Sequence, residues 1–97
     1  MKKEIMLRET LKGEIVCEFL DLVDYDSIET IGEILTNYFH AVIVDRLDGP
    51  SERIWKFKIN ELDFTLYNDP YGNSIKGKTK ESEKELSNIV KYWHLYS

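Results

Sequence analysis

Three aspartates within six residues, Asp21, Asp24 and Asp26, form the densest carboxylate group of the sequence. Carboxylates at this spacing could hold calcium, which prefers oxygen ligands. A calcium loop also needs a glycine at its sharp turn and a distal glutamate, and residues 28–34 supply neither in the required arrangement. We therefore expect no metal here. The three acids read as a polar loop with a helix N-cap, or as part of a surface that meets a basic partner.

The other side chains that could do chemistry are scattered. His40 and His94 have no cysteine or carboxylate at metal-ligand spacing, so we expect a helix-capping or solvated role. Cys17, the single cysteine, lies in an apolar segment and is expected to be a buried, inert thiol, with a reactive thiol as the alternative. One cysteine permits no intrachain disulfide, which fits a reducing compartment.

Signs of catalysis are missing from the sequence pattern. No strained nucleophile turn is evident, and the stretch Gly72–Gly77 lacks the pattern of a phosphate-binding loop. The sequence therefore predicts a protein that is not an enzyme and that has no cofactor.

The chain is acidic, with a formal net charge of -5 over 97 residues. This charge disfavours binding to a nucleic-acid backbone and favours encounter with a basic partner. A nucleic-acid module remains an alternative, because one sheet face is expected to carry lysines beside an aromatic ring: Lys56, Lys58, Tyr67 and Lys76.

Several tyrosines fall outside the expected core, and tyrosine is favoured at protein interfaces because it combines a rigid ring with a hydroxyl. They are Tyr25, Tyr67, Tyr71, Tyr92 and Tyr96. The alternative is that these rings only pack at edges of the fold. Combining two of them with loop and strand acids, we predict a partner-binding set made of Asp21, Asp24, Asp45, Asp48, Tyr67, Asp69 and Tyr71.

The element that organises the chain is a β-hairpin over residues 53–68. Apolar residues recur at every second position on either side of Asn60-Glu61. With those two residues as the turn, one face pairs Trp55 with Leu66, Phe57 with Phe64 and Ile59 with Leu62. The other face pairs Ile54 with Tyr67, Lys56 with Thr65 and Lys58 with Asp63. Slipping by one residue would expose an apolar set, so the pattern sets the register.

A second hairpin is expected over residues 4–11 and 15–20, turning at Lys12-Gly13-Glu14. A short helix over residues 2–12 is the alternative. Residues 41–47 are apolar and β-branched and predict a central strand, followed by a turn at 48–51. Another turn at 68–73 leads to a short edge strand over 74–76, and Gly77 is expected in an exposed loop.

Two amphipathic helices are predicted. The first runs from about Ser27 to Phe39, with Asp26 as N-cap and Glu29 completing a capping box. The second runs over about 81–94, with a capping box of Ser82 and Glu85. The expected buried stripes are Ile28, Ile31, Ile34, Leu35, Tyr38 and Phe39 in the first helix, and Leu86, Ile89, Val90 and Trp93 in the second. Gly32 interrupts the first helix, which a close contact with the sheet would explain.

These elements predict an α+β fold: an antiparallel sheet of four to six strands with two amphipathic helices on one face, forming one domain over 1–97. No apolar run is long enough to span a bilayer. The start of the chain shows no signal peptide, so a cytoplasmic location is expected.

The runs Leu47-Asp-Gly-Pro, Arg53-Ile-Trp-Lys-Phe-Lys-Ile, Phe64-Thr-Leu and Asn68-Asp-Pro-Tyr-Gly-Asn73, with a Glu-rich start to the last helix, resemble a small uncharacterised family of bacterial cytoplasmic proteins. In size, acidity and layout the chain is also similar to immunity proteins of polymorphic and contact-dependent toxin systems, a group that shares no common motif. The resemblance implies a non-enzymatic protein-binding domain, such as an inhibitor of a basic toxin or nuclease. A structural or regulatory homodimer, joined at an edge strand or through Ile54 and Tyr67, is the alternative.

Overall fold

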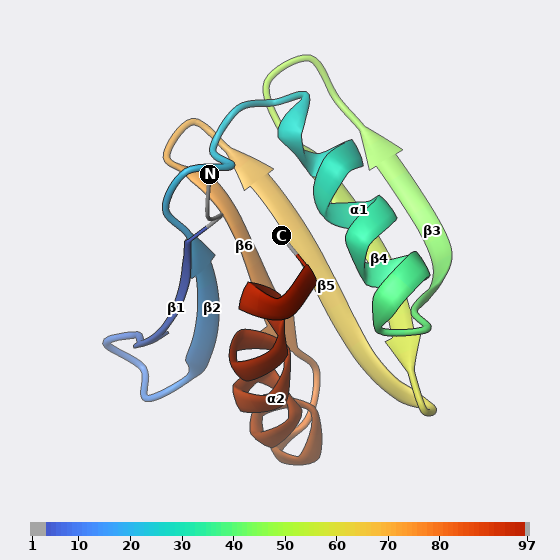
Figure 1. Cartoon of the computed structure of the whole chain (residues 1–97). Helices are drawn as coiled ribbons and strands as arrows, with labels where there is room; N and C mark the ends of the chain where they lie inside the picture. Colours follow the sequence, from blue (N-terminus) through green and yellow to red (C-terminus); the bar gives the residue numbers. More distant parts are fainter. Residues whose placement is uncertain (1–3, 97) are drawn as a thin grey trace.

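One antiparallel sheet of six strands carries both helices on the same face (Figure 1). The computed structural model describes residues 4–96, except for the side chains of His94 and Tyr96. The elements are β1 (Ile5–Glu9), β2 (Ile15–Phe19), α1 (Ser27–Tyr38), β3 (Val42–Asp48), β4 (Arg53–Ile59), β5 (Leu62–Asp69), β6 (Gly72–Gly77) and α2 (Lys80–Tyr96). The predicted α+β class is confirmed, with both helices on one face.

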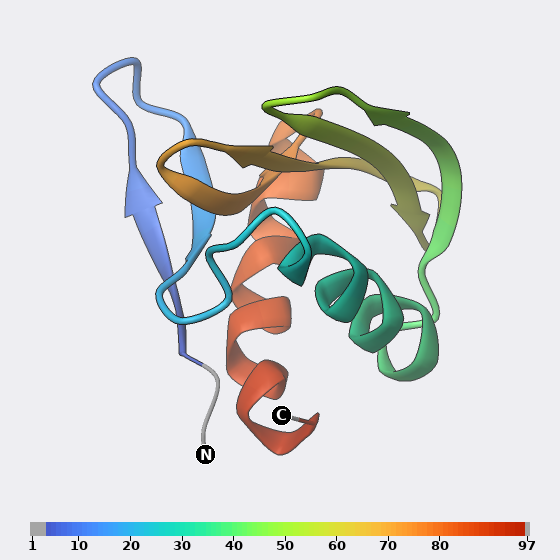
Figure 2. The same cartoon turned by 90° about the horizontal axis from the view of Figure 1, so that it is seen from above.

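The strand order is β1-β2-β6-β5-β4-β3, and every neighbouring pair is antiparallel. Figure 2 shows β1 and β2 turned away from the other four strands, so that the sheet curls around the helices. The concave face is covered by α1 and α2, and none of the described elements covers the convex face. A single hydrophobic cluster lies in the concavity and draws residues from both helices and from β1, β2, β4, β5 and β6.

The central hairpin has the register that the alternation predicts. Phe57 pairs with Phe64 on the covered face, and Lys56 pairs with Thr65 on the uncovered one. The two phenylalanine rings stack with their centroids 5.2 Å apart. Asn60 and Glu61 both have positive φ, 50° and 68°, as a two-residue turn between twisted strands requires. Burial of one face has therefore selected one register.

The N-terminal hairpin is also confirmed, and the alternative of a helix is wrong for the described residues. Leu7 pairs with Cys17, and Ile5 pairs with Phe19. The first strand is shorter than expected, since it ends at Glu9. Leu11 lies in the connecting loop and is fully exposed.

Two expectations about strand position are wrong. Residues 42–48 form an edge strand, not a central one, because β3 pairs only with β4. The short edge strand predicted over residues 74–76 is instead the longer strand β6 (Gly72–Gly77), which lies inside the sheet between β2 and β5. Apolar β-branched composition suggested burial for β3, yet Val42, Val44 and Leu47 are 53–64% exposed. Composition reports what a strand could bury, whereas strand order decides what it does bury.

Gly32 in α1 lies against the sheet, as the sequence suggested. A Cβ at this position would lie 2.7 Å from Cζ3 of Trp55 on β4. The capping box at the start of α1 is wrong, because Asp26 has helical dihedral angles and its side chain makes no cap hydrogen bond. Glu29 instead accepts a hydrogen bond from Arg53. Tyr38 is also not part of the buried stripe, since it is 49% exposed.

The N-terminal end of α2 is held differently from the prediction. Thr79 Oγ1 accepts the hydrogen bond of the Ser82 backbone N–H at 3.1 Å, so Thr79, and not Ser82, caps the helix. Ser82 is fully buried. Gly77 is not in an exposed loop; a Cβ there would lie 2.6 Å from the Glu83 backbone nitrogen, so the helix start packs directly on β6.

Candidate functional site

Three loops meet at one end of the sheet, the upper end in Figure 1. They are the β2–α1 loop over residues 20–26, the β3–β4 turn over 49–52 and the β5–β6 turn at 70–71. We call this region the loop end. Together with the last residues of β3 and β5, which flank these turns, the loop end includes five of the seven residues predicted to bind a partner: Asp21, Asp24, Asp48, Asp69 and Tyr71.

Two buried asparagines fasten the β2–α1 loop to the sheet. The Asn73 side-chain amide donates hydrogen bonds to the backbone oxygens of Leu22 (2.7 Å) and Asp24 (3.2 Å). Asn68 donates to Asn73 Oδ1 at 2.8 Å and to the Asp24 backbone oxygen at 3.3 Å. Because these donors occupy the loop's carbonyl oxygens, the loop is anchored through its backbone. The side chains of Asp21 and Asp24 remain exposed.

Arg53 fastens the β3–β4 turn to the same loop. Its side chain is only 6% exposed. It donates from Nε to Asp48 Oδ1 at 2.6 Å, from Nη1 to the Tyr25 backbone oxygen at 3.1 Å and from Nη2 to Glu29 Oε1 at 3.2 Å. Its guanidinium also lies over the Tyr25 ring, 4.7 Å from the centroid. Arg53 therefore joins the turn, the loop and the start of α1.

The Asp48 carboxylate is held by side-chain hydrogen bonds from within the protein. Its Oδ1 accepts a second hydrogen bond from Trp55 Nε1 at 2.8 Å. The side-chain hydrogen bonds from Arg53 and then from Trp55 hold the pKa of Asp48 below its ordinary value, because both donors favour the ionised carboxylate. Asp48 was predicted as a partner contact; the structure gives it a scaffolding role as well.

The β5–β6 turn presents the most exposed large ring of the loop end. Tyr71 is 96% exposed, and its backbone N–H donates to Asp69 Oδ1 at 2.8 Å. This local hydrogen bond is typical of an aspartate that fixes a tight turn. The carboxylate thus holds the turn that displays the ring.

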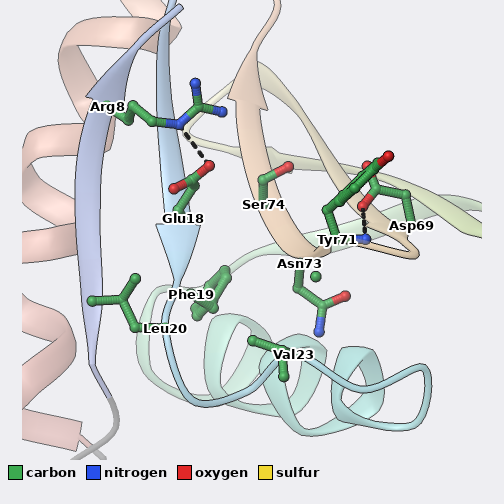
Figure 3. A pocket seen from close by; sticks show the side chains of 10 residues that line it. Arg8, Glu18, Phe19, Leu20, Val23, Asp69, Tyr71, Asn73 and Ser74 are labelled. Atoms are coloured by element: carbon green, nitrogen blue, oxygen red, sulfur yellow. Dashed lines mark hydrogen bonds and ion pairs between the residues drawn. The ribbon is translucent and has the colours of Figure 1, made fainter.

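A groove opens beside this turn, between β2 and β6 (Figure 3). These strands pair only at residues 16–18 and 74–76 and separate beyond that point. The open volume is about 480 Å³. We call it the β2–β6 groove. Its lining combines apolar side chains with two acids and a base: Phe19, Leu20, Val23 and Tyr71 with Glu18, Asp69 and Arg8.

The remaining two predicted residues lie away from the loop end. Asp45 is on edge strand β3, at a bulge where pairing passes from Ile43–Phe57 to Asp45–Lys56. Tyr67 is half-buried on the uncovered face of β5, with Lys76 Nζ 5.6 Å from its ring centroid. The predicted set is therefore divided between two surfaces.

Sequence analysis missed the residues that organise the site, although the alternation contained a signal for them. Arg53 continues the inward series of Trp55, and Asn68 continues that of Leu66. Because both residues are polar, the apolar alternation did not mark them as core positions. Polar residues at inward positions of a strand need buried partners, and here the partners come from loops distant in sequence.

The other reactive residues of the described range add no catalytic cluster. Cys17 is fully buried, and this burial, with a smaller effect of Glu18, raises the pKa of the thiol far above its ordinary value. His40 is exposed just after α1, whereas the side chain of His94 lies outside the described atoms. Across residues 4–96, no three His, Cys, Asp or Glu side chains are grouped to hold a metal ion. None of the helices described is long and apolar enough to cross a membrane.

No protein-family model, no curated protein and no solved structure matches the chain significantly. The resemblances to a bacterial cytoplasmic family and to immunity proteins therefore stay predictions.

Proposed function

We propose that this chain is a non-enzymatic protein-binding domain, of the immunity type, that covers a basic surface of a toxin or nuclease with its loop end. The observation that carries the proposal is the display of Tyr71, 96% exposed, among the exposed carboxylates of Asp21, Asp24 and Asp69 on a buried scaffold. Tyrosine side chains are enriched among the residues that contribute most to binding at protein interfaces.

The electrostatics of the loop end support a basic partner. The cation at its centre, Arg53, is nearly buried and already bonded to Asp48 and Glu29. The outward-facing aspartates are therefore not neutralised by it. Complementary charge of this kind mainly raises the association rate and is weakened by salt.

The test is capture of partners from the native host with tagged protein at low and high salt, followed by mass spectrometry. The proposal expects one stoichiometric basic protein, retained less at high salt. The variant Asp21→Asn, Asp24→Asn, Asp69→Asn, Tyr71→Ala should lose it; asparagine preserves the acceptor oxygens that Asp21 and Asp69 use in the fold.

A matched control removes three acids outside the loop end: Glu9→Gln, Glu14→Gln and Glu61→Gln. It should retain the partner, with both variants melting near the wild-type temperature. Recovery of no basic partner, or equal loss in the control, would contradict the proposal.

A second candidate function is a homodimer joined through β3. The observation that favours it is the exposure of Val42, Val44 and Leu47, at 60%, 53% and 64%, on a strand that forms one edge of the sheet. Such an edge offers unpaired backbone groups beside apolar side chains. Sedimentation velocity should then show a dimer that Leu47→Lys dissociates, while Leu95→Lys on α2 does not. A monomer at every concentration rules this candidate out.

The lysine-bearing face belongs to the third alternative, a nucleic-acid module. Lys56, Lys58 and Lys76 do lie on the uncovered face with Tyr67. Lys58 is ion-paired with Asp63 at 3.2 Å, and Lys76 lies over the Tyr67 ring. With a net charge of -5, these contacts favour the protein-binding proposal over this one.

A further inference from the structure

The β2–β6 groove has walls of a particular chemistry. Leu20 and Val23, 50% and 41% exposed, line it together with the buried Phe19. Figure 3 shows Leu20 on the side of β2 that faces β1, and Val23 in the β2–α1 loop below the β5–β6 turn that carries Tyr71 and Asp69. An occupant of the groove therefore meets aliphatic side chains, an aromatic ring and a carboxylate.

Both acids of the groove keep an oxygen for an incoming donor. Asp69 uses Oδ1 to accept the Tyr71 N–H, and within residues 4–96 its Oδ2 accepts no hydrogen bond. Glu18 uses Oε1 to accept from Arg8 Nε at 2.6 Å, and its Oε2 accepts none from the same residues. Two acids and one base leave the groove with a formal charge of -1. A cation is thus the complementary occupant.

The combination of aliphatic wall, aromatic ring and carboxylate matches an arginine side chain. Its methylene stem can lie on Leu20 and Val23 while its charged end remains near water. Its planar guanidinium stacks on aromatic rings and bonds carboxylates in a fork, which the compact ammonium of lysine cannot do. The chain's own Arg8 does not fill this position, because Glu18 holds it at the margin of the groove (Figure 3).

We propose that the β2–β6 groove binds an arginine side chain of the partner protein, with its stem against Leu20 and Val23 and its guanidinium between Tyr71 and Asp69. This inference rests on the proposed function and names the chemical group that the partner supplies. The groove volume of about 480 Å³ accommodates the side chain together with adjoining backbone.

The probe is the tripeptide acetyl-Ala-Arg-Ala-amide, titrated into the ¹⁵N-labelled full chain and followed by amide chemical shifts. Saturable shifts are expected over residues 18–23 and 69–74. The same tripeptide with citrulline, which is a neutral shape match, should bind roughly tenfold more weakly because the charge-assisted hydrogen bonds are lost. The lysine tripeptide should also bind more weakly than the arginine one.

Two variants localise the contact. Asp69→Asn preserves the acceptor for the turn but removes the charge, and Tyr71→Ala removes an exposed ring. Each should weaken arginine-tripeptide binding roughly five- to tenfold. Tyr92→Ala, on an exposed part of α2, is the control and should bind as the wild type does. Absence of shifts in the groove, equal binding of citrulline, or full binding by both groove variants overturns the assignment.

The outcome separates this inference from the proposed function. If a basic partner is captured equally by wild type, Asp69→Asn and Tyr71→Ala but is lost by the fourfold loop-end variant, the groove assignment fails and the protein-binding proposal stands. If the arginine tripeptide binds selectively but no basic partner is recovered, the groove assignment stands and the proposed function fails.

Discussion

Gly32 of α1 lies directly over the indole of Trp55 on β4, so close that a methyl group at position 32 would lie 2.7 Å from Cζ3. Arg46 covers the indole as well, with its guanidinium carbon 4.4 Å from the ring centroid. Trp55 Nε1 donates to Asp48. This contact therefore couples the packing of α1 to the turn that supports the loop end.

We predict that Gly32→Ala destabilises the protein by up to about 2 kcal/mol. Overpacking a rigid buried ring costs about 1–3 kcal/mol, and alanine returns up to about 1 kcal/mol of helix propensity. Chemical denaturation measures the difference. Asn37→Ala, exposed on the same helix, is the control and should not lower stability. A stabilised Gly32→Ala protein would show that α1 can shift freely from the sheet.

We predict that Phe57→Ala and Phe64→Ala each reduce the free energy of unfolding by about 3–5 kcal/mol, because both rings are buried in the core and stack on each other. Thr65→Ala, a neighbour on the uncovered face, should cost far less. Urea unfolding with tryptophan fluorescence is the measurement. A loss well below 1 kcal/mol at either phenylalanine would mean that the hairpin faces are reversed.

Gly77→Ala should destabilise the protein more than Gly49→Ala. At position 77 the added carbon meets backbone and Cβ atoms of Glu83 and Ser82 at 2.6–2.7 Å, which only a displacement of α2 can relieve. At position 49 the nearest neighbour is the Glu52 backbone oxygen at 3.2 Å. Thermal unfolding of the two variants compares them, and equal melting temperatures would contradict this packing of α2 on β6.

Asn73→Asp should loosen the β2–α1 loop. The carboxylate cannot donate to the backbone oxygens of Leu22 and Asp24, and it places a charge at a site only 3% exposed. Lost hydrogen bonds of this kind cost about 1–3 kcal/mol. Hydrogen exchange should increase over residues 20–26 and stay unchanged in β1. Unaltered exchange in the loop would mean that other contacts hold it.

The stabilising effect of the Asp48 charge should depend on pH. The folded-state pKa of Asp48 lies below its ordinary value of 3.8, chiefly because Arg53 bonds the carboxylate. The charge therefore stabilises the fold above about pH 4, and this contribution is lost as pH falls through the folded-state pKa.

The comparison is wild type with Asp48→Asn, unfolded by urea at pH values from about 7 down to about 2.5. The stability difference should be present at neutral pH and decrease as the pH falls below about 4. A difference that stays constant with pH would show that the charge has no part in it.

Sequence alone determined the local structure of this protein. Period-two apolar residues on both sides of Asn60-Glu61 allowed only one register to be buried, and the structure has it. Both helices followed from their apolar stripes. The helix caps could not be predicted in the same way. Asp26 and Ser82 are residue types suited to capping, but Asp26 makes no cap hydrogen bond, and Thr79 caps α2 in place of Ser82.

Tertiary structure alone decided strand order and the composition of the site. The apolar segment of β3 and the short segment around Ile75 are each compatible with a central or an edge strand. In the folded protein β3 forms an edge, whereas β6 lies inside the sheet because it pairs with both β2 and β5. Arg53, Asn68 and Asn73 act through loop carbonyl oxygens and carboxylates that the sequence does not bring near them. Local patterns encode which face of an element is buried, but the partners of a buried polar group depend on contacts between distant segments, and these form only when the chain has folded.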